Sequence, residues 1–320
     1  DFFYEPDDPS VDDPFAEVMV YHHLTQLSHH FEDVHGHEFP EPATAYVNYR
    51  ESDNGTYENA GYANVDGYHL FLFGQGEMVD FGYDGDVIAH EFGHAVVHGR
   101  TDLVHGSIAT YDEFGGNVAP GALDEGMADY WACTYHDDPV QGEYISVAMD
   151  ARELTNDHTC PEDVVGESHG DGQIPGGAMW DVRDVLGRDL TDEIVYEALG
   201  LLSSSPSLRE FAEAVATTAE DMVEDGDITA ADADAVDDIL HARGLYACGR
   251  SVPLEDGVAT TLHLGHLEGY GMETLSPNIC NTFRADGVRF DSRFQWELQL
   301  PPAEEGEVLE IELDLDIQRL

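Results

Sequence analysis

Three histidines and a glutamate stand at regular spacing in the stretch DVIAHEFGHAVVHGR, residues 86–100. On a helix, side chains four residues apart share a face, so His90 and His94 can bind one ion through ring nitrogens at about 2.0–2.1 Å. His98 lies one turn further along, about 5.4 Å away, which is too far to bind the same ion. Glu91 follows His90 directly, where a carboxylate can hold a water molecule and take its proton. The spacing therefore predicts a two-histidine metal site with a general base beside it.

Such a site needs a third ligand, and two patterns compete to supply it. The pattern HExxHxxGxxH takes a third histidine, but Val97 and Arg100 occupy the positions of its glycine and that histidine. The other pattern takes a glutamate from a second helix. The stretch GALDEGMADYWA supplies Glu125, with Asp129 one turn later on the same face, placed to accept the other ring N–H of a ligating histidine. The alternative, that both carboxylates belong to a general acidic surface, fits less well with their small, apolar neighbours.

Together with RELTND and PEDVVGESHGDGQIPGGAMWDVRDVLG, these motifs resemble the thermolysin-like gluzincins, most closely their fungalysin branch. The similarity covers residues 12–246. It implies an α+β fold with two lobes, a mixed β/α upper lobe over 1–98 and a helical lower lobe over 99–246, with zinc in the cleft between them. The implied activity is that of a secreted zinc endopeptidase, made as a precursor, that hydrolyses peptide bonds through a metal-activated water.

Carried over position by position, the resemblance implies that His90, His94 and Glu125 are the zinc ligands. It implies that Glu91 is the general base and that Asp129 is the carboxylate partner of His90. His169, just before a glycine-rich turn into a helix, corresponds to the histidine that donates to the tetrahedral oxyanion. Neighbouring carboxylates would keep it protonated for that purpose, although a plain surface histidine is the alternative. Asn59 and Ala60 correspond to the strand edge that holds the extended peptide, and Arg152 to the arginine that holds the substrate carbonyl beyond the scissile bond.

The charge of the chain limits the setting in which this chemistry runs. There are 67 acidic residues against 12 basic ones, all of them arginine, and the net charge is −55. Such a chain repels itself in dilute salt, whereas the Debye length falls to about 3 Å at 1 M salt. The composition resembles that of proteins from halophilic archaea and predicts adaptation to high salt. The 42% of hydrophobic and 10% of aromatic residues favour a globular chain over an acidic disordered one.

Periodicity places the motifs on regular elements. Strands are predicted at 43–50 and 67–76, where β-branched and aromatic residues are dense. After residue 246, apolar and polar residues alternate between turns, which predicts a small antiparallel β module over 247–320. Whether that module ends at Leu320 stays open. The helices are predicted over 14–34, 86–98, 122–136, 176–187, 191–202, 207–223 and 229–243.

Six histidines crowd the first predicted helix and the residues after it: His22, His23, His29, His30, His35 and His37. A metal-binding tract is one interpretation of this composition. We prefer the other interpretation, an amphipathic helix with surface and half-buried histidines.

Further expectations concern location and partners. The sequence has no run of about 18 apolar residues, so we expect no membrane insertion, and nucleic acid is excluded because it is itself an anion. The first residues do not form a signal peptide, so the chain is cytosolic or, as the resemblance implies, a secreted mature form without leader and propeptide. We expect a monomer acting on proteins or peptides, with one zinc ion and, as in some relatives, calcium at carboxylates that the sequence does not single out. The cysteines form two disulfides or stay thiols: Cys133, Cys160, Cys248 and Cys280.

Two rival functions stay open. A non-catalytic surface or adhesion protein can retain a peptidase fold and bind through its β module. A non-peptidase zinc hydrolase would share the same metal site. Retention of the base, three ligands and His169 together favours the peptidase.

Overall fold

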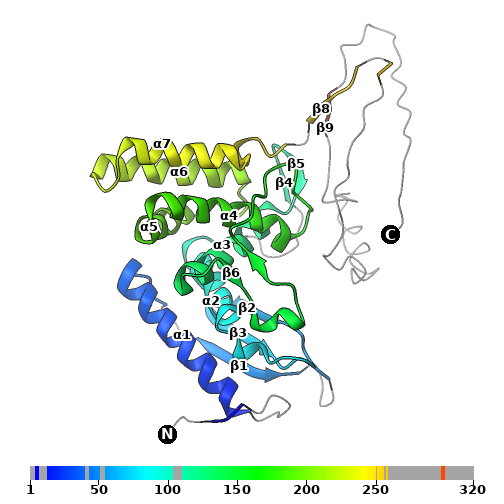
Figure 1. Ribbon diagram of the computed structural model, residues 1–320, viewed down its shortest axis with the longest axis vertical. Coiled ribbons are helices and arrows are strands. Elements are labelled where there is room, and N and C mark those ends of the chain that lie inside the picture. Colours follow the sequence, from blue (N-terminus) through cyan, green and yellow to red (C-terminus); the bar gives the residue numbers. More distant parts are fainter. Residues whose placement is uncertain are drawn as a thin grey trace.

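The fold is mixed α/β, with seven α-helices and several small sheets in the part of the chain that the structure describes. In Figure 1, α1, the largest sheet and α2 gather at one end, and α5, α6 and α7 lie at the other. The helices are α1 Pro14–His35, α2 Gly85–Arg100, α3 Ala119–His136, α4 Ser168–Leu186, α5 Arg188–Leu199, α6 Leu208–Asp225 and α7 Ala230–Ala242. The computed structural model describes residues 4–6, 13–39, 43–50, 55–103, 110–249, 251–255, 257–258 and 297–299.

The largest sheet has three strands in the order β1-β3-β2. They are β1 Thr44–Tyr49, β2 Ala60–Val65 and β3 Tyr68–Gly74; β3 runs parallel to β1 and antiparallel to β2. Alternate residues of β3 are buried because one face of the sheet packs on the helices. Shorter pairs are β4 Thr110–Asp112 with β5 Gly115–Asn117, and β6 Val140–Gln141 with β7 Arg152–Glu153.

Helix α2 is the central element and is buried over most of its length. The side chain of Asp84 caps its first turn by accepting a hydrogen bond from the backbone N–H of Asp86 at 2.9 Å. On one side of α2, Phe92 packs against Phe31 of α1 and Phe71 of β3, with ring centroids 5.5 and 6.4 Å apart. This aromatic packing fixes the rotation of α2 and directs its histidines the opposite way.

Helices α2, α3 and α4 approach closely because small residues stand at their crossings. A Cβ on Gly93 of α2 would lie 2.8 Å from the Cα of Ala128 in α3. A Cβ on Gly126 of α3 would lie 2.3 Å from the carbonyl oxygen of Gly172 in α4. Both distances are too short for any side chain, so glycine at these positions sets the spacing that lets side chains of all three helices converge.

The structure corrects two predictions about elements. Helix α4 begins at Ser168 rather than near residue 176, because Glu167 caps it by accepting from the backbone N–H of Gly170 at 2.9 Å. The glycine-rich segment is therefore helical, and His169 lies in the first turn of α4 rather than before the helix. In the predicted antiparallel β module, β8 Ser251–Pro253 pairs with β9 Glu297–Gln299 in parallel. Most of the remaining module lies outside the described residues.

The cysteines form neither two disulfides nor four free thiols, the two arrangements expected from the sequence. Cys160 and Cys248 form a disulfide that ties the segment before α4 to the segment after α7. Cys133 is a buried free thiol in α3, and Cys280 lies outside the described residues. Within the described residues no helix is long and apolar enough to cross a membrane.

One member of the histidine-rich region is part of the core rather than the surface. His37 is 6% exposed, and its Nδ1 lies 3.0 Å from the hydroxyl of Tyr196 in α5. Burial, and then the nearby charges of Arg100 and His69, lowers the pKa of His37 from 6.5 to about 4. The unfolded chain binds a proton here below about pH 6.5 and the folded chain does so only near pH 4, so acid favours unfolding over that window.

We expect the free energy of unfolding to fall between pH 6.5 and 4 by up to about 3 kcal/mol on account of His37. His37→Gln should flatten this part of the curve, and the same change at exposed His29 should not. Urea unfolding in about 1 M sodium chloride, where carboxylate repulsion is screened, measures the effect. Identical pH curves for wild type and His37→Gln would contradict the assignment.

Candidate metal centre

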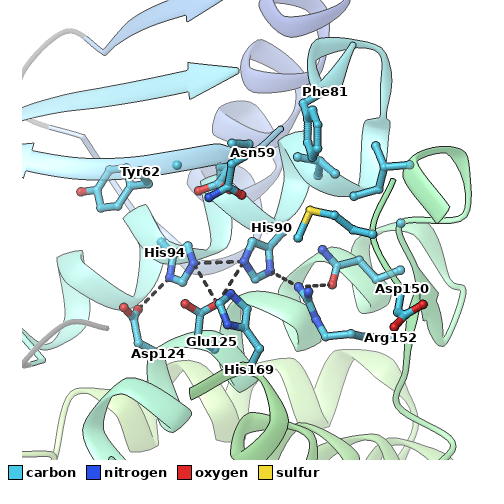
Figure 2. A pocket seen from close by; sticks show the side chains of 18 residues that line it. Asn59, Tyr62, Phe81, His90, His94, Asp124, Glu125, Asp150, Arg152 and His169 are labelled. Atoms are coloured by element: carbon cyan, nitrogen blue, oxygen red, sulfur yellow. Dashed lines mark hydrogen bonds and ion pairs between the residues drawn. The ribbon is translucent and has the colours of Figure 1, made fainter. Parts of the chain in front are cut away.

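Three side chains from two helices present one ligand atom each to a common point. His90 and His94 come from α2 and Glu125 from α3, and their ligand atoms all lie within 4.8 Å of one another. The two Nε2 atoms are 3.1 Å apart, and Glu125 Oε2 lies 3.3 Å from His90 Nε2 and 3.5 Å from His94 Nε2 (Figure 2). Ligands about 2.0–2.1 Å from a tetrahedral zinc ion are about 3.3 Å apart, so this donor set fits that ion.

His98 does not join this group. Its Nδ1 lies 3.3 Å from the carboxylate of Asp102, four residues further along the chain. Among the described residues, the group of His90, His94 and Glu125 is the one in which three potential ligands converge. The histidines of α1 form no such group within the same part of the chain.

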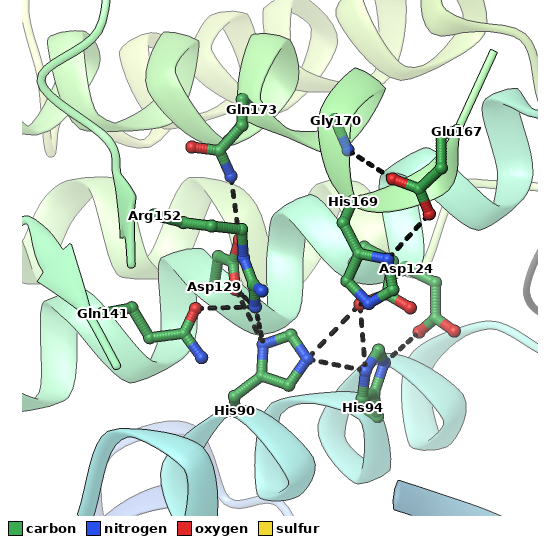
Figure 3. A network of polar contacts seen from close by, with 11 residues as sticks. His90, His94, Asp124, Asp129, Gln141, Arg152, Glu167, His169, Gly170 and Gln173 are labelled. Carbon is green, nitrogen blue, oxygen red and sulfur yellow. Dashed lines mark hydrogen bonds and ion pairs between the residues drawn. The ribbon is translucent and has the colours of Figure 1, made fainter. Parts of the chain in front are cut away.

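Each of the two histidines has a carboxylate on its other ring nitrogen. His90 Nδ1 lies 2.8 Å from Asp129 Oδ1, and His94 Nδ1 lies 2.9 Å from Asp124 Oδ1 (Figure 3). A carboxylate at Nδ1 holds the proton there and leaves the Nε2 lone pair for a metal. The sequence predicted the contact of Asp129. It gave no separate signal for Asp124 other than its position directly before Glu125.

Arg152 lies on β7 and binds Asp129 rather than standing free. Its Nε and Nη2 donate to the two carboxylate oxygens of Asp129 at 2.7 Å each, and Nη2 also donates to Gln141 at 2.8 Å. Gln173 of α4 donates to the same carboxylate at 3.0 Å. Burial alone would raise the pKa of Asp129, but Arg152 and His90 outweigh it and hold that pKa well below its usual range. In this arrangement Arg152 orients the carboxylate behind His90, and it also lines the pocket.

Glu91 lies in the same pocket and is 6% exposed. Burial raises its pKa, and the neighbouring His90 and His94 oppose that rise. A carboxylate of raised pKa next to a metal site is suited to take a proton from water and to give it up again. Glu91 therefore has both the position and the environment of a general base.

His169 reaches the site from the first turn of α4. Its Nε2 lies 3.3 Å from Glu125 Oε2, and its Nδ1 lies 2.9 Å from the carboxylate of Glu167. Burial alone would lower the pKa of His169, but Glu125 and Glu167 raise it overall. When the ring is protonated, it can donate a hydrogen bond into the pocket. Glu167 was missed from the sequence; its place at the start of a helix, two residues before the histidine, was the available signal.

The pocket around these groups extends to the edge of the sheet. Asn59 and Ala60, predicted to hold substrate, line it at the start of β2, together with Tyr62. The pocket is also lined by apolar side chains: Phe81, Val87, Ile145 and Met149. The structure thus brings every sequence-predicted site residue except Asp129 to the pocket wall, and it places Asp129 directly behind His90.

One edge of β2 has no neighbouring strand within the described residues. The carbonyl of Asn59 accepts from the N–H of Gly74 in β3 at 3.0 Å. In an antiparallel pair, bonding to the partner alternates along the strand, so the backbone groups of Ala60 and Tyr62 point away from β3. Within the described residues β2 has no strand on that side. An extended peptide can therefore pair there as an additional strand.

Comparison with known proteins adds no assignment. No protein-family model matches the chain, and a search of curated proteins finds no match.

Proposed function

We propose that this chain is a zinc-dependent endopeptidase with a thermolysin-like two-lobed fold, closest to the fungalysin branch and adapted to high salt. The observation that carries the proposal is the convergence of His90, His94 and Glu125 with Glu91 in one pocket. The carboxylate on each histidine, the raised pKa of His169 and the edge of β2, which pairs with no further strand within the described residues, support it. The disulfide between Cys160 and Cys248 is consistent with secretion, because such bonds persist in oxidising compartments.

The chain's own residues divide the reaction between them. The substrate peptide pairs with the backbone of Ala60 and Tyr62 along β2. This pairing places the carbonyl of the peptide bond to be cleaved next to the three ligands. His90, His94 and Glu125 would hold the zinc ion, which would supply a Lewis acid that polarises a water molecule and the carbonyl. Glu91 takes the proton of the water and later gives it to the leaving amine, and His169 donates a hydrogen bond to the oxygen on which negative charge develops. Arg152 and Asp129 hold His90 in position throughout.

Two other functions remain for the experiment to separate. A non-catalytic surface or adhesion protein with a peptidase fold would bind proteins without cleaving them. A non-peptidase zinc hydrolase would bind zinc and leave proteins intact. The general base Glu91 beside the three ligands favours an enzyme over a binding protein, and the edge of β2, which has no neighbouring strand within the described residues, favours an extended peptide as substrate.

The decisive experiment is cleavage of denatured casein in molar sodium chloride, with and without a chelator. We expect cleavage by wild type, loss of cleavage on chelation and recovery with zinc. His94→Ala should lose both zinc and cleavage, because two ligands do not hold the ion at the same affinity. His98→Ala, at the same spacing on the same helix, should keep about one zinc per chain, because His98 pairs with Asp102. Zinc loss in His98→Ala with retention in His94→Ala would overturn the ligand assignment.

A further inference from the structure

We propose that Asp124 is a positioning residue that fixes the orientation and tautomer of His94 and thereby determines how tightly and how long the chain holds its metal. The inference rests on the proposed function, and it adds to that function a residue that no sequence motif assigned. Asp124 lies in α3 directly before the ligand Glu125. Its side chain is 5% exposed, and that of His94 is 11% exposed.

The geometry shows how one pair of adjacent residues holds the ring from both sides. Asp124 Oδ1 lies 2.9 Å from Nδ1 of His94, and Glu125 Oε2 lies 3.5 Å from Nε2 of the same ring. Consecutive residues on a helix point about 100° apart, so Asp124 and Glu125 diverge and can reach opposite edges of one imidazole. Figure 2 shows the His94 ring lying between these two carboxylates.

The tautomer follows from this arrangement. An imidazole that donates its Nδ1–H to a carboxylate has its lone pair on Nε2, the atom that faces His90 Nε2 and Glu125. The opposite tautomer would direct a proton at the ion and leave a buried carboxylate facing a lone pair, which is unfavourable. Asp124 therefore holds the proton on Nδ1 and leaves Nε2 as the atom of His94 that faces the ion.

Different residues orient the two histidines, so the contribution of Asp124 to metal binding can be measured separately from that of Asp129. The carboxylate of Asp129, which lies behind His90, is also bound by Arg152 and Gln173, so these two residues help to orient it. In addition, Arg152 Nη2 lies only 3.5 Å from His90 Nδ1. A positive charge beside His90 lowers the electron-donating capacity of that ring, whereas the carboxylate of Asp124 raises that of His94. We infer that His94 is the stronger of the two histidine ligands.

The test is the zinc affinity and zinc release rate of the full chain, measured by competition with a chromogenic chelator in molar sodium chloride. We compare wild type, Asp124→Asn, Asp124→Ala and the control Asp157→Asn, which removes an exposed carboxylate. We expect zinc binding to weaken about 10- to 100-fold in Asp124→Ala, mostly through faster release, and less in Asp124→Asn, whose amide oxygen still accepts a hydrogen bond. Asp157→Asn should match wild type, and the melting temperature of the metal-free variants should stay close to that of wild type.

Zinc affinity within about twofold of wild type in both Asp124 variants would overturn the inference. If the variants do not fold, nitrogen-15 spectra of histidine-labelled, zinc-loaded wild type provide a second test. They should show His94 protonated at Nδ1 and bound to the metal through Nε2, and metal bound at Nδ1 would overturn the inference equally. Wild type that binds no zinc at all would instead contradict the proposed function, so the two failures are distinguishable.

Discussion

Glu91→Gln should lower the rate of peptide hydrolysis by about 10²- to 10⁴-fold while the chain keeps its zinc. Glutamine has nearly the same shape as glutamate but cannot take a proton from water, so proton transfer is lost and the three ligands survive. Because Glu91 is buried in the pocket, bulk water cannot efficiently take over the lost proton transfer. The measurement is kcat/KM on a peptide that reports cleavage, with zinc per chain determined on the same sample.

The matched control for Glu91 is Glu193→Gln, which removes one negative charge at an exposed position of α5. That variant should keep the full rate. A Glu91→Gln enzyme that keeps both zinc and full activity would remove Glu91 from the mechanism. Loss of zinc in that variant would show that Glu91 holds the ion, which is not the role assigned to it here.

Stability should rise steeply with salt, and this is the second large effect. Two carboxylates about 5 Å apart in water repel each other by about 0.8 kcal/mol, and shortening the Debye length from about 10 to about 3 Å removes roughly 0.4 kcal/mol of it. With a net charge of −55, on the order of 20 such pairs would give about 8 kcal/mol of stabilisation. That sum is comparable to the whole stability of a typical domain.

The structure identifies where part of this repulsion arises. Exposed carboxylates recur at i,i+4 spacing on α6 and α7, where like charges are destabilising by about 0.2–0.5 kcal/mol a pair. The pairs are Glu220 with Glu224, Asp221 with Asp225 and Asp234 with Asp238. In dilute salt these helices carry a penalty that molar salt removes.

The melting temperature at fixed zinc should therefore increase by about 10–20 °C between about 0.1 and about 3 M sodium chloride. Replacing Glu224, Asp225 and Asp238 with lysine should reduce that increase, because each change turns a repulsive pair into an attractive one. Replacing the same three residues with glutamine should have a smaller effect in the same direction. A flat curve for wild type would rule out adaptation to high salt and would leave the metal site untouched.

Several features followed from the sequence because they depend only on neighbours along the chain. The helical repeat alone places His90 and His94 on one face and His98 a turn away, and the structure has a helix over Gly85–Arg100. The strands around residues 43–50 and 67–76 were predictable for the same reason, since alternation with a period of two needs no distant contact. The net charge needs no structure at all.

Other features were decided only by how the helices cross. Gly93 against Ala128 and Gly126 against Gly172 bring α2, α3 and α4 so close that Asp124 reaches His94, and no local pattern distinguishes that aspartate from dozens of other carboxylates. The same holds for Arg152: the resemblance implied a contact with substrate, and only the fold shows that this side chain also binds Asp129. Local spacing fixes the direction of a side chain along its own helix. The partner that it meets depends on the distance and angle between helices, which residues far apart in the sequence determine together.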